Sequence, residues 1–427
     1  MRVRRGGICT AALCSTLLLA ACGPGTDAKA AHHTPVRIAD APARLPIPRG
    51  KGSSTAEDFN GDGHRDLVLD ALVKAQRHTD DAGIGVVYGS AHGLTPGARQ
   101  LLSPAKYAAR TKGQLPAVFD AEASCDLDGD GFTDLIVSTD PPYDGQGRPP
   151  VPLQILFGSP AGLTHAVTLT VPAAARFGND WPDQPVCGDF DGDGGEDLVL
   201  HASGGRLSYL RGPFSRKGRP RAAGAPIPST GEFPAGSAAD VNRDGYDDLV
   251  VRTTQGTSKA SVVLGGPTGP TRTGVVLPEG IDIALGRFGK GRTLDAAVGA
   301  MGETSLRYDL PTPTRATLPS PGSMLDAADF DGDGLSELVS SGSQLRVFRG
   351  RTTGLSKAGM VTVEPPARGT TRVLTAGDFD GDGRADLAVR TYRGETKDTV
   401  AVYAGAKKGL VADEPAVTFS TSEFLVG

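Results

Sequence analysis

The chain has 427 residues and a formal net charge of −5, a length that allows two or three ordinary domains or one large repetitive domain. Its 59 glycines and 32 prolines make a turn-rich composition in which long helices are not expected. Apolar runs such as 83-GIGVVYG-89 and 153-LQILFG-158 are short and are bounded by Gly, Pro, Asp or Asn. This pattern predicts an all-β protein with many short strands.

Residues 1–21 predict an export signal. Arg2, Arg4 and Arg5 precede an apolar stretch, residues 8–19, that is too short to span a bilayer. The sequence 19-LAAC-22 resembles the cleavage box of a bacterial lipoprotein, which implies that Cys22 becomes the lipid-modified first residue. Residues 22–50 then predict a Pro- and Ala-rich tether on the outer face of the bacterial cell membrane. The alternative is an ordinary secretory signal and a secreted protein.

The cysteine count points to one pair. Cys9 and Cys14 would leave with the signal and Cys22 would carry lipid, so only Cys125 and Cys187 remain. Two cysteines in an oxidising compartment favour a disulfide, and both precede equivalent loops that could lie on neighbouring strands. Two buried free thiols are the alternative.

One acidic nonapeptide recurs along the chain. Six copies are 58-DFNGDGHRD-66, 126-DLDGDGFTD-134, 189-DFDGDGGED-197, 240-DVNRDGYDD-248, 329-DFDGDGLSE-337 and 378-DFDGDGRAD-386. A seventh, 287-RFGKGRTLD-295, keeps Phe288 and Asp295 but loses the other acidic positions. Five copies are followed later by a Gly-x-x-x-Gly landmark, as in 158-GSPAGL-163. Successive copies start 42 to 68 residues apart, and a motif that recurs at such intervals indicates a repeat architecture.

Each repeat predicts about four strands, because apolar runs precede and follow both landmarks. A four-stranded unit cannot bury both of its faces alone, so the units must pack on one another. Radial packing gives a seven-bladed β-propeller, and a linear β-solenoid is the competitor. The expected blades are residues 51–112, 113–178, 179–232, 233–279, 280–319, 320–369 and 370–427.

The paired landmarks resemble the FG-GAP, or VCBS, repeats of integrin α-subunit propellers and their bacterial relatives. The resemblance covers about residues 51–427. It implies a propeller of four-stranded antiparallel blades whose acidic loops bind Ca²⁺.

The spacing within the nonapeptide independently indicates a calcium site. Acidic or amide side chains at positions 1, 3, 5 and 9, with the carbonyl at position 7, supply six or seven hard oxygen ligands. A simple turn-forming role is the alternative. The predicted ligands are Asp58, Asn60, Asp62, His64, Asp66; Asp126, Asp128, Asp130, Phe132, Asp134; Asp189, Asp191, Asp193, Gly195, Asp197; Asp240, Asn242, Asp244, Tyr246, Asp248; Asp329, Asp331, Asp333, Leu335, Glu337; and Asp378, Asp380, Asp382, Arg384, Asp386.

The loops are not equivalent. The first and fourth loops carry Asn60 and Asn242 at position 3, so each has one negative charge fewer than the other acidic loops. The fourth also has Arg243 in place of a glycine. The copy that begins at Arg287 and contains Lys290 is expected to bind no ion. About six Ca²⁺ ions are therefore expected.

No catalytic constellation is evident in the sequence, so we expect a non-catalytic module that binds a protein or a glycan. The candidate ligand contacts are Trp181, the only tryptophan, and Tyr143 and Arg148, which lie in a long insertion. A polysaccharide hydrolase or lyase on a propeller scaffold, and a purely structural lipoprotein, are the alternatives. We expect a monomer with no nucleic-acid partner.

Overall fold

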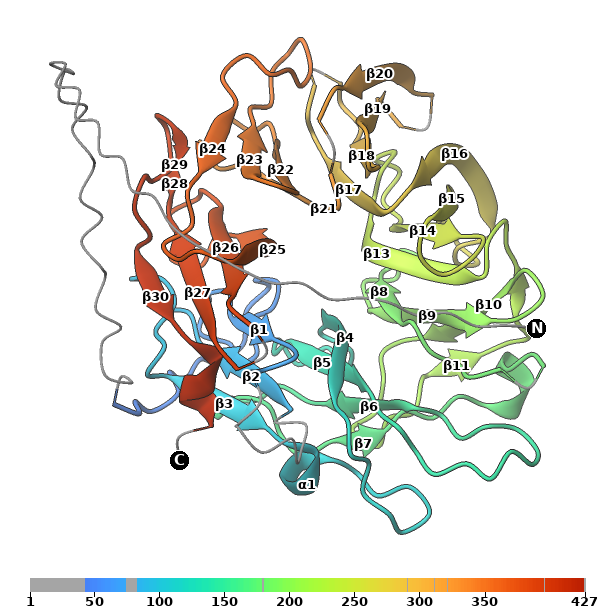
Figure 1. The fold of residues 1–427 in the computed structure, drawn as a ribbon. Helices are drawn as coiled ribbons and strands as arrows, with labels where there is room; N and C mark the ends of the chain where they lie inside the picture. The colour runs from blue at the N-terminus through green and yellow to red at the C-terminus, as the bar shows by residue number, and fades with distance from the viewer. Residues whose placement is uncertain are drawn as a thin grey trace, which may run out of the picture. The chain divides into compact units, whose positions relative to one another are not determined.

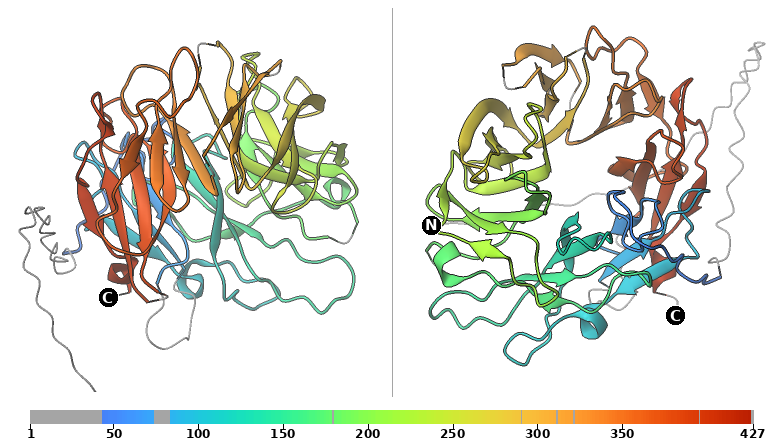
Figure 2. Two further views of the ribbon diagram at one scale, coloured as in Figure 1. Left: turned by 45° about the horizontal axis from the view of Figure 1, so that its top comes forward. Right: turned by 180° about the vertical axis from the view of Figure 1, so that it is seen from behind.

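Antiparallel β-sheets follow one another along the chain and stand radially around a common centre (Figures 1 and 2). This computed structural model describes residues 43–73, 83–178, 180–289, 291–310, 312–320, 322–394 and 396–425. The predicted signal, Cys22, most of the tether, residues 74–82 and Lys290 lie outside these residues. The prediction of an all-β, seven-bladed β-propeller is confirmed.

Within each blade the strands pair mainly in chain order. The first four sheets are β1 (Leu67–Leu69), β2 (Ile84–Val87) and β3 (Arg99–Leu102); β4 (Asp120–Cys125), β5 (Asp134–Ser138), β6 (Leu153–Leu156) and β7 (Val167–Thr168); β8 (Val186–Gly188), β9 (Asp197–Ala202), β10 (Arg206–Arg211), β11 (Ala222–Ala223) and β12 (Ile227–Pro228); and β13 (Phe233–Ala239), β14 (Asp248–Arg252), β15 (Ser258–Leu264) and β16 (Arg272–Gly280).

The last three blades are more uniform. They comprise β17 (Asp282–Gly286), β18 (Asp295–Gly299), β19 (Thr304–Tyr308) and β20 (Thr314–Leu318); β21 (Met324–Ala328), β22 (Glu337–Ser341), β23 (Leu345–Phe348) and β24 (Val361–Val363); and β25 (Thr370–Gly377), β26 (Asp386–Tyr392), β27 (Asp398–Tyr403) and β30 (Val417–Phe419), with the hairpin β28 (Gly405–Ala406) and β29 (Leu410–Val411). The helical segments are short: α1 (Pro104–Tyr107), η1 (Ala173–Ala175) and η2 (Thr421–Phe424).

The hydrophobic core lies between blades. Each buried cluster combines residues of two adjacent sheets, as where Phe59 of the first blade packs with Leu135 of the second. Position 2 of every nonapeptide is part of such a cluster, and Phe190, Phe288, Phe330 and Phe379 are all 0% exposed. Because blades bury their faces only against neighbours, the ring is the smallest unit that completes the core.

Among the described residues, no strand is shared between the first and last blades. The described strands of the first sheet are β1, β2 and β3, while β30 pairs with β27 in the last blade. Side chains join the two blades instead: Arg390 of β26 donates to the carbonyl oxygens of Asp70 and Ala71 at 2.8 and 2.9 Å. Arg65 donates to the carbonyl of Ala376 at 3.1 Å.

No helix in the described parts of the chain has the length and apolar character needed to cross a membrane.

Candidate functional site: the acidic loops

The six acidic loops share one backbone conformation. Each joins the first strand of its blade, or in the first blade the segment before β1, to the next strand, and the carboxylate at position 1 folds back over the loop. In the second loop Asp126 accepts hydrogen bonds from the N–H groups of Gly129, Asp130 and Gly131 at 2.9, 3.1 and 2.7 Å. Gly131 has φ 85°, a conformation that favours glycine. The loop therefore turns back on its own first side chain.

Four of the loops bring three carboxylates together. In each of these groups one oxygen from every member lies within 4.8 Å of the others. The groups are Asp126, Asp128 and Asp134; Asp189, Asp191 and Asp197; Asp329, Asp331 and Asp333; and Asp378, Asp380 and Asp386. Converging hard oxygen atoms of this kind could hold a divalent cation.

The loops that contain asparagine differ from these four. Asn60 Nδ2 donates to Asp62 at 3.3 Å, and Asn242 Nδ2 donates to Asp244 at 3.2 Å. An amide N–H turned toward a carboxylate supplies no ligand oxygen, so these loops offer fewer acceptors to a cation. The sequence predicts weaker calcium binding by these two loops because each has one negative charge fewer. The amide orientation is a second reason for weaker binding.

Residues upstream of the first loop also cover it. The N–H of Gly50 donates to the carbonyl of Asn60 at 3.0 Å, and the hydroxyl of Ser53 donates to Asp58 at 2.6 Å. Asp58 and Asn60 are 1% and 0% exposed. The side chains at positions 1 and 3 of the first loop are therefore buried.

The carboxylate at position 9 has a structural role that the sequence did not reveal. Asp134 accepts from the N–H of Leu127 at 3.0 Å and from the N–H of Gly158 at 2.9 Å. Gly158 is the first glycine of the downstream landmark, and a Cβ there would lie 2.4 Å from the carbonyl oxygen of Thr133. One side chain thus joins the two recurring motifs of a blade.

The fifth repeat keeps this structural bond after losing the other acids. Asp295 accepts from the N–H groups of Phe288 and Gly289 at 2.8 and 2.9 Å and from the N–H of Asp309 at 2.7 Å. The blade therefore retains its connection between loop and turn, which explains why Asp295 persists where Arg287, Gly289 and Gly291 have replaced the acidic residues.

Burial makes these carboxylates hard to ionise without a counter-charge. Burial, with neighbouring aspartates as a smaller cause, raises the pKa of Asp134 to about 8 against the opposing backbone hydrogen bonds. The same causes raise the pKa of Asp66 to about 8 and that of Glu337 to about 7. A bound cation would favour the ionised form of each group.

Arginines contact five of the six loops at position 3 or 5. Arg216, from the turn after β10, reaches back to the second blade, where it lies 2.5 Å from Asp128 and also contacts Asp130. Its guanidinium lies over the ring of Phe157 at 5.0 Å. The other pairs are Arg211 with Asp191, Arg221 with Asp193, Arg272 with Asp244, Arg349 with Asp331, and Arg384 with Asp382.

Several loops also contact the next blade. The N–H of Thr133 donates to the carbonyl of Asp58, and the N–H of Asp247 donates to the carbonyl of Asp189, both at 3.0 Å. The ring of Phe132, at position 7, lies so close to Gly61 that a Cβ there would be 2.4 Å from it. The sequence predicts only a carbonyl ligand at position 7, but the side chain there packs between blades.

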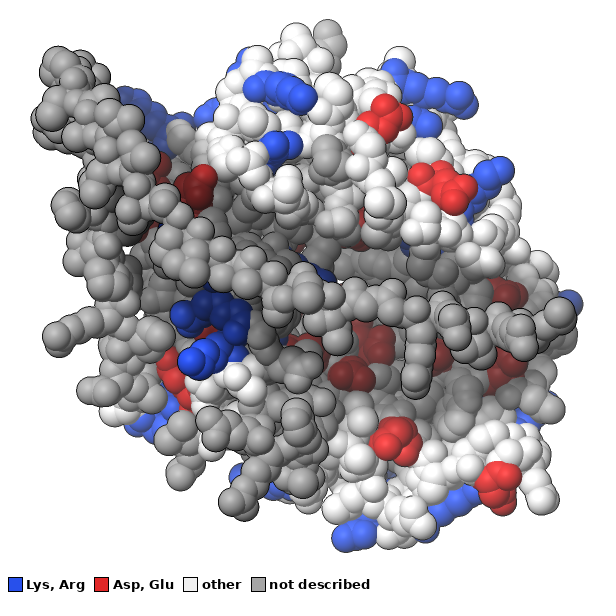
Figure 3. All heavy atoms as spheres, in the orientation of Figure 1, with Lys and Arg blue, Asp and Glu red and all other residues white. Residues whose placement is uncertain are grey.

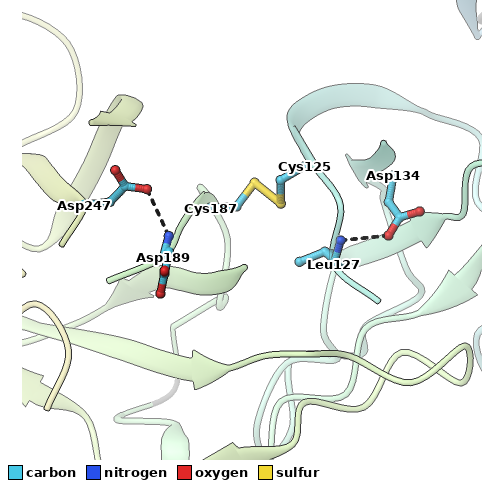
Figure 4. The surroundings of a disulfide bond; sticks show 6 residues. All are labelled: Cys125, Leu127, Asp134, Cys187, Asp189 and Asp247. Atoms are coloured by element: carbon cyan, nitrogen blue, oxygen red, sulfur yellow. Dashed lines mark hydrogen bonds between the residues drawn. A yellow bond between two sulfur atoms is a disulfide. The ribbon is translucent and has the colours of Figure 1, made fainter. Parts of the chain in front are cut away.

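A disulfide connects the second and third blades beside their acidic loops (Figure 4). Cys125 ends β4 and Cys187 lies in β8, with their Cα atoms 6.4 Å apart. The bond spans 62 residues of sequence. Both cysteines line a central cavity of about 1090 Å³ that also contains Glu122, Glu196 and Asp247. Acidic side chains are visible in the recessed middle of the face shown in Figure 3.

The three candidate ligand contacts lie at the strand ends opposite the acidic loops, because β5 runs away from its loop. Trp181 and Tyr143 meet edge to face, with ring centroids 5.5 Å apart. Arg148 instead donates to the carbonyl of Ala173 at 3.1 Å and does not line the pocket beside Trp181.

Comparisons with known proteins agree with the repeat and the fold. Residues 312–389 match the FG-GAP-like repeat, and residues 234–276 match the FG-GAP repeat. The chain is 30% identical over 165 residues to integrin alpha-PS5 of Drosophila melanogaster; the match spans 37% of this chain and only 15% of that protein.

Two solved structures align with most of this chain at low identity. An Agrocybe aegerita lectin that recognises non-reducing terminal N-acetylglucosamine aligns over 88% of this chain and 92% of its own, with 14% identity and a TM-score of 0.51. BBS1N in complex with ARL6DN aligns over 87% and 97%, with 15% identity and a TM-score of 0.46. Taken with the recurring loops and turns, these matches show that the chain contains FG-GAP repeats in a β-propeller and is similar in part to an integrin α subunit.

Proposed function

We propose that the protein is a calcium-binding, extracytoplasmic β-propeller, anchored through lipid at Cys22, that acts as a non-catalytic binding or adhesion module for a protein or glycan. Its integrin-like repeats support a binding role. Fold alone does not fix function, so the proposal depends on the chemistry of the loops and of the opposite end of the strands.

The main support for calcium is the second loop. Asp126, Asp128 and Asp134 converge within 4.8 Å, and three backbone N–H groups already orient the carboxylate of Asp126. Asp130 and the carbonyl of Phe132 would add further oxygens. A bound Ca²⁺ would supply positive charge where burial disfavours the ionised carboxylates, and so would stabilise the contact between neighbouring blades.

The arginine contacts predict competition with calcium. Arg216 neutralises Asp128 and Asp130, so an incoming cation must displace it. We expect Arg216→Ala to tighten calcium binding at the second loop by roughly 2- to 5-fold, since half-exposed ion pairs are worth up to about 1 kcal/mol. Calorimetric titration of metal-free protein measures this.

Arg219→Ala is the matched control, because Arg219 is an exposed arginine of the same turn and, among the described residues, no ion pair joins it to the loop. Equal affinities for the two variants would show that Arg216 does not compete with the ion.

The binding function is tested by applying the purified mature protein to a glycan array and to whole cells, with and without a calcium chelator. We expect capture of a specific glycan or surface protein that is lost with chelation as the blades loosen. If protein shown to be folded captured no specific ligand from the glycan array or from whole cells, the proposed function would be contradicted.

A further inference from the structure

A pocket of about 490 Å³ lies between the second and third blades, at the strand ends opposite the acidic loops. Its walls come from β4, from the turn after β5 and from the segment that precedes β8. Glu122, at a register shift of β4, contributes one wall, and Trp181 contributes another. Bulged strand positions often re-aim a side chain next to a binding site.

The pocket is built from fixed parts. The indole of Trp181 is held edge to face by Tyr143 at 82°. Thr139 anchors the turn after β5 by donating from its backbone N–H and its hydroxyl to the carbonyl of Pro152, at 2.8 and 2.6 Å. Asp140 accepts from the N–H groups of Ala117 and Val118 at 2.8 and 3.1 Å. A pre-formed apolar wall with a few convergent polar groups is typical of a small-ligand site.

The backbone beside the pocket is strained. Gln184, which lines the pocket, has φ 52°, a left-handed conformation that is uncommon for residues other than glycine. Backbone strain concentrates at binding sites, so this conformation supports a ligand site here.

The charge of the lining indicates what that ligand carries. Glu122, Asp140 and Asp183 contribute carboxylates, and no lysine or arginine is among the described residues that line the pocket. Burial raises the pKa of Asp183, with His201 opposing the shift, so a cationic ligand would favour its ionised form. The indole and the flanking Pro141 and Pro152 form an apolar wall, so the ligand should also carry an apolar surface.

We propose that this pocket binds a protonated amino sugar. The C–H face of the sugar ring lies on the indole of Trp181, and the ammonium group donates to the carboxylate of Asp183. This assignment rests on the proposed binding function and specifies the glycan for it.

Calorimetric titration of the calcium-loaded mature protein with glucosamine, glucose and lysine amide tests the assignment. These probes present the ring with the ammonium, the ring alone, and an ammonium without the ring. We expect glucosamine to bind at least about 10-fold more tightly than either of the others, because each lacks one recognised feature.

Two variants identify the residues. Asp183→Asn keeps an acceptor but removes the charge, so the preference for glucosamine over glucose should fall by about 10-fold. Trp181→Ala should abolish binding of both sugars, whereas Phe177→Ala, which removes an exposed aromatic of the same connection outside the pocket, should leave binding unchanged. Melting temperatures show whether each variant is folded.

Equal binding of glucose and glucosamine would overturn the assignment, as would lysine amide binding as tightly as glucosamine. Absence of binding by all three probes would also overturn it. In that case capture of another glycan or of a surface protein in the array and whole-cell experiment would leave the proposed function intact.

Discussion

Arg390→Ala is expected to destabilise the ring by about 3–5 kcal/mol, because it leaves a buried carboxylate unpaired. Arg390 Nε lies 2.7 Å from Asp398, and the two side chains are 2% and 0% exposed. Asp398 also accepts from the hydroxyl and the N–H of Thr421 at 2.7 and 3.0 Å. Urea unfolding in the presence of calcium measures the loss.

The effect should be centred on the junction between the last and first blades. Arg390 donates to Asp70 and Ala71 across that junction, so hydrogen exchange of β1 and β26 should accelerate most.

Arg393→Ala is the control, since this exposed arginine lies in the same hairpin and should change stability by less than about 0.5 kcal/mol. The paired replacement Arg390→Met with Asp398→Leu should cost less than Arg390→Ala alone, because it leaves no buried charge. Equal unfolding midpoints for Arg390→Ala and Arg393→Ala would contradict this account of ring closure.

Removal of calcium is expected to lower the melting temperature more at pH 8 than at pH 5. In the metal-free fold the pKa values of Asp66 and Asp134 are raised from 3.8 to about 8. The unfolded chain therefore releases these protons at a lower pH than the folded chain does. As a result, the metal-free fold loses stability as pH rises from about 4 to about 8. Calcium binds the ionised carboxylates and should reverse this dependence, with a combined effect of several kcal/mol.

Melting curves of dialysed, metal-free protein and of calcium-loaded protein across this pH range provide the measurement. Asp128→Asn, which reproduces the amide of the first and fourth loops, should reduce the stabilisation by calcium. Glu303→Gln removes an exposed charge from the blade that lacks an acidic loop and should have no such effect. A metal-free protein whose melting temperature rises between pH 5 and pH 8 would refute the prediction.

The repeated loops illustrate what can be predicted locally. The spacing of Asp126, Asp128 and Asp134 is sufficient to predict that their oxygens converge, because nine residues with two glycines can fold back on themselves without help from the rest of the chain. The same spacing with Asn60 or Asn242 does not predict that the amide N–H turns toward the position 5 carboxylate, because that orientation depends on the surrounding hydrogen bonds.

Position 9 shows where a local interpretation falls short. The spacing predicts Asp134 only as a ligand, yet this residue also bonds to Gly158, which lies 24 residues away. The recurring spacing cannot distinguish these roles within one loop. Asp295 is the available signal, because it persists in the one repeat whose other acidic positions are lost.

The sequence by itself determined the repeat, the number of blades and the places where acidic loops occur, because these features depend on contacts within a few residues and on a period that is visible along the chain. Only the tertiary structure decided how the ring closes through Arg390, how Cys125 pairs with Cys187, and that Trp181 contacts Tyr143 and lines a pocket. These contacts join segments that are distant in the chain. Their partners are set by how neighbouring blades pack, and the pattern within any one blade does not contain that information.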